Sequence, residues 1–339
     1  MKKVRIEDAI GMALAHDLTR IVPGKFKGVG FKKGHIVRQA DLAELHKIGK
    51  QHLYALELSS ERLHENDAAR RIAQAICGPK LAKTDPVEGK INMVSQTSGL
   101  LKIDTRRLLR INKMADIIVS TLKTNFPCPK GQVVAATRII PLTINRRKIE
   151  RLEAIAAQGG PVIALLPFRP LKVGVVVTGT EIYEGLIPDG FDRQVKVILD
   201  RFGAKIIRKI MVPDDPSAIA EALRALIANR CDLLITTGGL SVDPDDVTKK
   251  GILQAGARLV AYGSPVLPGA MFLYARLQDT PVLGLPACVY YHDTTIFNLV
   301  LPRILAGEEI TKNEIAALGH GGLCLNCPTC RFPVCPFGK

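Results

Sequence analysis

The chain has 339 residues, of which 47% are hydrophobic and 5% aromatic, and its formal net charge is +15. This length exceeds one typical domain and predicts two or three folded units, with the aliphatic composition of many α/β proteins. No apolar run approaches the roughly 20 residues needed to span a bilayer, and Glu7 and Asp8 interrupt the start where a signal peptide would be apolar. We therefore expect a cytoplasmic protein without a membrane partner.

The excess positive charge belongs to the first half of the sequence. Residues 1–170 hold 30 Lys and Arg against 15 Asp and Glu, whereas residues 171–320 hold 15 against 17. A basic surface can steer small anions as well as polynucleotides. The sequence has no helix-turn-helix, zinc-finger or aromatic RNA-binding motif, so nucleic acid is not the expected partner.

The first half predicts two small α+β regions. Residues 1–60 alternate short strand-like runs and glycine turns around one amphipathic helix, Gln39–Ile48, which ends at Gly49. Residues 61–165 form the second, irregular region. Its expected helices are residues 61–77 and Thr105–Leu122, and its expected β-type runs are Val133–Ala136 and Arg138–Leu142.

From residue 171 the pattern changes to apolar strand-like runs that alternate with amphipathic helices. The expected strands are Lys172–Val177, Ala204–Met211, Asp232–Thr236, Arg258–Ala261 and Pro281–Gly284. The expected helices are Phe191–Phe202, Pro216–Ala228, Val247–Ala255 and Tyr291–Leu305. Buried strands separated by single helices predict a doubly wound α/β domain over residues 171–312, with a mostly parallel sheet covered on both faces.

The loops at the carboxyl ends of these strands form the candidate site, because ligands of open α/β sheets lie there. The loop after the third strand begins Thr237-Gly238-Gly239-Leu240-Ser241. Its glycine pair allows backbone amides to approach a phosphate, and Thr237 and Ser241 add hydroxyl donors. The sequence therefore predicts an anion cradle.

Three acids follow this cradle, at Asp243, Asp245 and Asp246. Such crowding beside a phosphate fits a divalent cation such as Mg²⁺. The alternative is that Asp245 or Asp246 only caps the helix that starts near Val247. The residues alone leave both readings open.

Other phosphate-binding motifs are missing from the sequence. Neither G-x-G-x-x-G after a strand nor G-x-x-x-x-G-K-[ST] occurs, which disfavours a dinucleotide dehydrogenase and a P-loop NTPase. His292 and Asp293 are expected to be structural or surface residues, since adjacent residues on a helix diverge by about 100°.

Several ordered strings of the second half resemble one known domain. They are Thr178-Gly179-Thr180-Glu181, Gly238-Gly239-x-Ser241, Asp246-Val247-Thr248-Lys249, Pro268-Gly269 and Leu285-Pro286. In this order and at these separations they resemble the molybdopterin-binding domain shared by gephyrin, plant and bacterial molybdenum insertases and molybdopterin adenylyltransferases. The start of the chain, residues 8–17, looks more weakly like the insertase branch.

The resemblance implies roles for individual residues. Gly238, Gly239 and Ser241 would hold the terminal phosphate of molybdopterin, Asp246 would bind metal, Glu181 would be a second catalytic acid, and Lys249 would neutralise phosphate or molybdate. The other residues expected to bind substrate are Thr178, Gly179, Thr237, Asp245, Pro268, Gly269 and Pro286. One departure concerns the family's usual Leu-Pro-Gly-Asn/Ser-Pro, which here reads Leu285-Pro286-Ala287-Cys288-Val289. Ala287 adds a methyl group where close backbone approach is expected, which is unfavourable for catalysis even if binding is retained.

The resemblance implies a transferase that inserts molybdate into molybdopterin or activates the pterin phosphate with a nucleotide such as ATP or CTP. The insertase-like start favours insertion. The altered loop favours the alternative, a carrier or sensor of the cofactor that serves a molybdoenzyme. A third reading is hydrolysis of nucleotide pyrophosphates. Homo-oligomers are common in this family and are expected here.

Residues 313–339 are expected to form a cysteine-rich metal-binding tail. Four of the eight cysteines lie in the last 16 residues, as Cys324-x-x-Cys327-x-x-Cys330-x-x-x-x-Cys335-Pro336. Four thiolates at this density can hold a zinc ion or an iron–sulfur cluster. The spacing is one residue longer than the ferredoxin run, and both metals stay open, as do redox or sulfur handling and a disordered tail.

Overall fold

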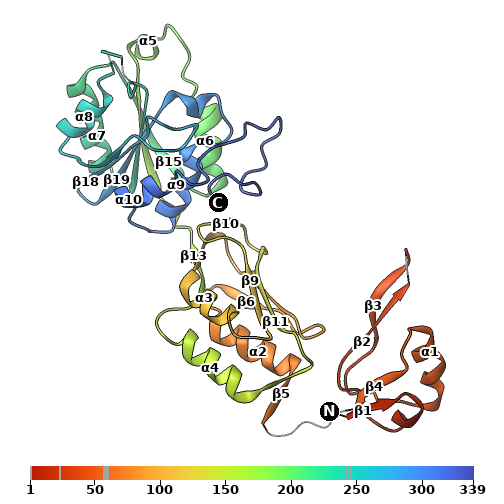
Figure 1. Cartoon of the computed structure of the whole chain (residues 1–339). Coiled ribbons are helices and arrows are strands. Elements are labelled where there is room, and N and C mark those ends of the chain that lie inside the picture. Colours follow the sequence, from red (N-terminus) through yellow and green to blue (C-terminus); the bar gives the residue numbers. More distant parts are fainter. Residues whose placement is uncertain (1, 23, 56–60, 242, 245) are drawn as a thin grey trace. The chain divides into compact units, whose positions relative to one another are not determined.

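The computed structural model describes residues 2–22, 24–55, 61–241, 243–244 and 246–339. The chain divides into two compact units (Figure 1). Unit 1 comprises Met1–Gln96, Leu101–Thr124 and Lys130–Leu165, and unit 2 comprises Thr97–Leu100, Asn125–Pro129 and Leu166–Lys339. The finer boundaries, at residues 60 and 313, stay predictions. Within the described ranges no helix has the length and apolar character to cross a membrane.

Unit 1 begins with a small α+β module. Strand β1 (Lys2–Arg5) pairs antiparallel with β4 (His52–Ala55), and β2 (Leu18–Val22) pairs with β3 (Phe26–Phe31). The helix predicted at residues 39–48 is confirmed as a 3-10 turn followed by α1 (Leu42–Lys47). The core of this module contains Ile6, Leu14, Leu45 and Leu53, all buried.

The rest of unit 1 packs helices against an antiparallel sheet of strand order β6-β7-β11-β9. These strands are Leu81–Lys83, Ile91–Ser95, Val133–Ile139 and Ile117–Thr121. The helices are α2 (Glu65–Ile76), α3 (Thr105–Asn112) and α4 (Arg146–Ala156). Strand β5 (Arg62–His64) pairs with β12 (Thr143–Asn145). A further sheet of order β10-β8-β13, from Pro127–Cys128, Gly99–Ile103 and Ile163–Pro167, does not belong to unit 1 alone, since β10 and parts of β8 and β13 are assigned to unit 2.

The helix predicted over Thr105–Leu122 is wrong in its second half. Helix α3 ends at Asn112, Asp116 adopts a left-handed φ of 70°, and the following residues form β9. The Asn112 side-chain amide donates to the Val119 carbonyl at 2.8 Å and accepts from the Val119 amide at 2.9 Å. These two bonds hold β9 beside the end of α3. The β-branched run that starts at Ile117 prefers a strand, and the apolar periodicity concealed the turn.

Unit 2 contains a six-stranded sheet of order β15-β14-β16-β19-β18-β17. The strands are Lys205–Val212, Lys172–Thr178, Leu233–Thr237, Thr280–Leu285, Leu273–Leu277 and Arg258–Tyr262. The first four run parallel, and β18 runs antiparallel to both β19 and β17, which confirms a mostly parallel α/β sheet. Strand β18 was not predicted. Its hairpin with β19 turns at Gln278, which adopts a left-handed φ of 55°, and the turn lacks the glycine that usually marks a hairpin in a sequence.

The predicted helices of unit 2 occur in the predicted order, as α6 (Phe191–Arg201), α7 (Pro216–Ala228), α8 (Thr248–Gln254) and α9 (Ile296–Leu305). Two short helices, α5 (Thr180–Tyr183) and α10 (Lys312–Ala317), were not predicted. The prediction that a helix starts at Tyr291 is wrong. Residues Ala287–Tyr290 form a 3-10 turn, and Thr295 caps α9 by accepting from the Phe297 amide at 3.2 Å. His292 and Asp293 therefore lie in a loop.

The sheet of unit 2 is buried on both faces. Val175 and Val177 of β14 pack in a core with α6 and α9, whereas Val176 packs in a second core with α7 and α8. Figure 1 shows α7 and α8 together on one side of this sheet. Because successive side chains alternate between faces, such a strand must be apolar throughout. The strand ends that carry the candidate site are thereby held in a rigid scaffold.

Candidate functional site

The predicted site loops leave the sheet of unit 2 at one edge. Strands β14, β16 and β19 are adjacent and parallel, and they end at Thr178, Thr237 and Leu285. Strand β17 is antiparallel to β18, which is antiparallel to β19, so its end at Tyr262 lies at the same edge. The loop that contains Pro268 starts there. The structure therefore brings all of these loops together.

The glycine pair of the central loop is required by close packing. Gly238 and Gly239 have left-handed φ values of 92° and 56°. A Cβ added to Gly238 would lie 2.4 Å from the Thr178 carbonyl oxygen, and one added to Gly239 would lie 2.6 Å from Thr248 Oγ1. No side chain fits at either position. Both glycines are only half-buried, so their backbones remain at the surface of the loop.

Buried threonines link the loops beneath the glycines. The Thr178 hydroxyl donates to the Thr237 carbonyl at 3.1 Å and lies 3.0 Å from the Thr248 hydroxyl. The Thr248 amide donates to the Gly239 carbonyl at 3.1 Å. Thr178, predicted to bind substrate, therefore uses its hydroxyl within the protein. Its role toward a ligand stays a prediction.

Thr237 differs from these threonines because its hydroxyl is fully buried and, among the described residues, has no hydrogen-bond partner. The Tyr290 phenol lies beside it. Burial raises the pKa of Tyr290 to about 12, and the nearby Thr237 hydroxyl opposes the rise. The buried Thr237 hydroxyl therefore faces the Tyr290 phenol inside the protein, and its role toward a ligand stays a prediction.

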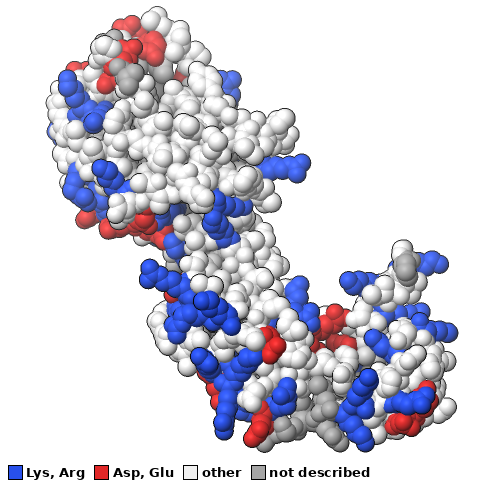
Figure 2. Space-filling view, viewed as in Figure 1, with Lys and Arg blue, Asp and Glu red and all other residues white. Residues whose placement is uncertain are grey.

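The predicted acids lie on two different loops. The Asp246 carboxylate accepts from the Asp243 amide at 3.1 Å, and Glu181 is exposed with its carboxylate turned toward Gly179. Figure 2 shows acidic side chains gathered at the end of unit 2 that carries α5. In the described part of the chain, no three His, Cys, Asp or Glu side chains stand close enough to hold a metal ion. Asp245 lies outside the described residues.

Lys249 is held by an aromatic ring that the sequence did not identify. Its Nζ atom lies 4.4 Å from the centroid of the Tyr262 ring, a cation–π contact. The Tyr262 hydroxyl donates to the Leu240 carbonyl at 2.9 Å, next to Ser241. One side chain thus positions both the cation and the anion-cradle loop. The only sequence signal for Tyr262 is its place at the carboxyl end of a strand.

Asp214 is a second residue that sequence reasoning missed. Its carboxylate accepts from the Thr180 amide at 2.9 Å, and its own amide donates to the Thr180 hydroxyl at 3.2 Å. These bonds fix the start of α5 beside Gly179 and Glu181. The acid pair Asp214-Asp215 directly after a strand is a signal that could have indicated a role at this edge.

Two further predicted segments are held by packing. Gly269 has a φ of 133°, and a Cβ there would lie 2.5 Å from Cγ2 of Ile296, while the Pro268 carbonyl accepts from the Ile296 amide at 3.2 Å. These contacts hold the loop against the start of α9. Pro286 is buried and Ala287 is exposed, so the residue that departs from the family pattern lies at the surface of this edge.

Known proteins match the region that carries these loops. Residues 174–306 match the model of a family described as a probable molybdopterin binding domain, and residues 3–57 match a domain of unknown function (DUF8806). The match to the probable molybdopterin binding domain lies within unit 2 and includes the loops described above.

Curated relatives align with part of the chain. It is 33% identical over 156 residues to a molybdopterin molybdenumtransferase of Haemophilus influenzae, which aligns 43% of this chain and 38% of that protein. It is 34% identical over 84 residues to a CinA-like protein of Amoebophilus asiaticus, covering 25% of this chain and 20% of the relative. The chain thus spans well under half the length of these relatives. The molybdopterin biosynthesis enzyme MoaB of Thermus thermophilus aligns with 41% of this chain and 98% of its own, at 20% identity and a TM-score of 0.34.

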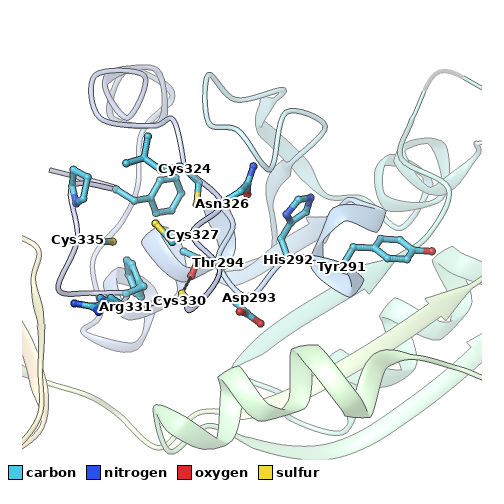
Figure 3. A pocket seen from close by; sticks show the side chains of 14 residues that line it. Tyr291, His292, Asp293, Thr294, Cys324, Asn326, Cys327, Cys330, Arg331 and Cys335 are labelled. Carbon is cyan, nitrogen blue, oxygen red and sulfur yellow. Dashed lines mark hydrogen bonds between the residues drawn. The ribbon is translucent and has the colours of Figure 1, made fainter.

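The tail cysteines lie beyond the matched molybdopterin-binding domain but within unit 2. All four of them line one cavity of about 250 Å³, together with the loop Tyr291–Thr294 (Figure 3). None of the eight cysteines forms a disulfide. The Cys330 sulfur lies 2.9 Å from the Thr294 hydroxyl. The four cysteines predicted to bind metal thus line one cavity. Among the described residues, neither they nor other His, Asp or Glu side chains form a group that could hold a metal ion, and metal binding by the tail stays a prediction.

Proposed function

We propose that unit 2 binds molybdopterin with its phosphate over the Gly238-Gly239 turn. The protein then acts in molybdenum cofactor biosynthesis, by inserting molybdate or by activating the pterin phosphate. The observation that carries this proposal is the left-handed glycine pair with no room for a Cβ, where two loops meet at the carboxyl edge. The family match of residues 174–306 supports molybdopterin as the ligand.

The proposed chemistry is positioning and charge neutralisation. The Gly238 and Gly239 amides donate to the phosphate, helped by the exposed Ser241 hydroxyl, whereas the buried Thr237 supports the loop from beneath. Lys249, oriented by its contact with Tyr262, supplies positive charge. These groups bind and orient the substrate without forming a covalent bond to it.

Asp246 is the residue that would hold Mg²⁺. Proteins bind this ion through one or two carboxylates completed by substrate phosphate and water, so a single carboxylate beside the cradle fits it. The ion would supply further neutralisation of the phosphate and of the reacting oxyanion. Glu181, turned toward Gly179, would be the second acid and contribute to binding of the cation's water shell.

Asp246→Asn tests the proposal, with Asp279→Asn as the matched control because Asp279 lies on the exposed hairpin between β18 and β19. The full chain is incubated with molybdopterin and molybdate, or with ATP or CTP and Mg²⁺. We expect turnover to fall about 100-fold in Asp246→Asn, the size of effect seen when one electrostatic group is removed, and to stay unchanged in the control. Equal turnover in both variants would contradict the assigned role.

The second candidate function is a carrier or sensor that hands the cofactor to a molybdoenzyme. Ala287, exposed at the site where the family has glycine, favours it. The φ of Ala287 is not positive, so its backbone does not require glycine. An effect of Ala287→Gly on pterin binding or turnover would therefore come from the space that the missing methyl group leaves for the ligand. Tight pterin binding without turnover in both wild type and Ala287→Gly identifies a carrier. Turnover gained by Ala287→Gly identifies an enzyme site narrowed by one methyl group.

The proposal also includes a cytoplasmic location, homo-oligomeric assembly and metal binding by the tail cysteines. Sedimentation of the full chain with and without pterin tests the assembly. A monomer under both conditions would remove that part and leave the pterin site intact.

A further inference from the structure

The cysteine segment, residues 322–338, forms a closed loop. Near its start, the Leu267 amide donates to the Gly322 carbonyl and the Cys324 amide donates to the Leu267 carbonyl, both at 2.8 Å. At its end, the Gly338 amide donates to the Gly321 carbonyl at 2.9 Å. Phe337 is 3% exposed and belongs to the core that contains α9. Packing at both ends therefore fixes this loop to unit 2.

The loop encloses the cavity of about 250 Å³ whose lining includes all four tail cysteines. Cys324 and Cys335 are half-buried against the core, whereas Cys327 and Cys330 are exposed. Figure 3 shows the four cysteines arranged around one space, with the loop that carries His292 and Asp293 beside it. The thiols face a common volume although they lie up to 11 residues apart in sequence.

The dimensions of this site disfavour a single zinc ion. Four thiolates bind a zinc ion at about 2.3 Å, so their sulfurs converge on one point. Among the residues that the structure describes, no three metal-binding side chains are close enough for one ion. An iron–sulfur cluster differs because its thiolates surround a core of several iron and sulfide atoms. Four cysteines that line one cavity of about 250 Å³ match that requirement.

We propose that the cysteine loop binds a [4Fe–4S] cluster through Cys324, Cys327, Cys330 and Cys335. This site is independent of the proposed pterin function. The spacing between the third and fourth cysteines exceeds the ferredoxin run by one residue. A turn accommodates the extra residue, since the Val334 amide donates to the Arg331 carbonyl at 2.7 Å and returns the chain to the cavity.

The other residues of the cavity suit such a cluster. A cluster with four thiolates carries net negative charge, which Arg331 in the lining of the cavity offsets and Asp293 in the same lining increases. The Thr294 hydroxyl, 2.9 Å from the Cys330 sulfur, can donate to that thiolate. Hydrogen bonds to the sulfurs and partial exposure to solvent set the reduction potential of a cluster.

The test uses the full chain, purified without oxygen and supplied with sulfide, ferric iron and a dithiol that reduces half of the iron. We expect about four iron and four sulfide per chain, a broad visible absorption band that bleaches with dithionite, and the electron paramagnetic resonance signal of a reduced cluster. Cys327→Ser and Cys330→Ser are the informative variants, because both cysteines are exposed and contribute little to packing. Cys77→Ser in unit 1 is the matched control.

Both loop variants should lose most of their iron, while Cys77→Ser keeps it and all variants keep the circular dichroism of the wild type. One zinc per chain with no iron or sulfide would overturn the proposal, as would a metal-free chain or equal iron in Cys77→Ser and the loop variants. Titration of molybdopterin on the same preparations separates this result from the proposed function. If the chain binds pterin but no cluster, only the cluster proposal fails. If it binds a cluster but no pterin, only the proposed function fails.

Discussion

Gly238→Ala tests whether close packing, rather than backbone conformation alone, requires glycine in the cradle. The left-handed φ of 92° costs an alanine about 1–2 kcal/mol. The added Cβ would lie 2.4 Å from the Thr178 carbonyl oxygen, so Thr178 must move. That movement disrupts its hydroxyl contacts with Thr237 and Thr248, worth about 1 kcal/mol each. We expect a total loss of about 3 kcal/mol in the free energy of unfolding of unit 2.

Gly256→Ala is the matched control within the same unit. Gly256 has a φ of 99°, but nothing lies within 4 Å of an added Cβ. Its cost is therefore the conformational part alone, about 1–2 kcal/mol. The gain that alanine brings by restricting the unfolded chain is the same at both positions and cancels. Urea unfolding followed by circular dichroism, with hydrogen exchange of peptides from β16, measures both variants. Equal losses of stability would refute the close-packing argument.

Three further predictions concern unit 2. Lys249→Met should keep the stem on Tyr262 but weaken pterin binding about tenfold by calorimetry, with exposed Lys250→Met as the control; an unchanged affinity would remove Lys249 from the phosphate site. Arg303→Met should destabilise unit 2 by about 3 kcal/mol, because Arg303 is buried and binds the Glu308 and Glu314 carboxylates; a loss below about 1 kcal/mol would contradict this. Burial raises the pKa of Glu314, but hydrogen bonds from Thr311 and Arg303 outweigh it and lower the pKa from 4.5 to about 2. The resulting stability should be complete above about pH 4.5 and lost as the pH falls toward 2, and Glu314→Gln should flatten that part of the pH profile.

The architecture of unit 2 was predictable because its elements are strongly patterned. Helix α7 has the predicted bounds, Pro216–Ala228, since Asp215 caps it and Pro216 occupies its first turn. The errors arose where local signals were weak. Residues 117–121 continue an apolar periodicity but follow a tight turn, and β18 joins its hairpin without a glycine. In both cases strand pairing decided the outcome, and pairing depends on partners distant in sequence.

The candidate site shows the same division. The motifs located the glycine pair and the loops around it, because the left-handed backbone and the close packing at both positions admit glycine only. Tyr262 and Asp214 were missed because their roles exist only through contacts, one with Lys249 and the Leu240 carbonyl, the other with Thr180. Nothing in their local sequence encodes those neighbours. The contacts of the Thr178 hydroxyl with Thr237 and Thr248 were missed for the same reason, and its role toward substrate stays a prediction.

The cysteine loop is the clearest case in which local sequence predicts the ligands but not the space between them. Spacing alone indicated metal but could not separate zinc from an iron–sulfur cluster, since both use four thiolates. What separates them is the size of the space between the sulfurs, and that size is set by residues outside the motif. Leu267 fixes the start of the loop, Gly321 fixes its end, and Phe337 anchors it in the core. A metal preference determined by such distant contacts cannot be predicted from cysteine spacing, because the motif supplies the ligands while the fold supplies the volume.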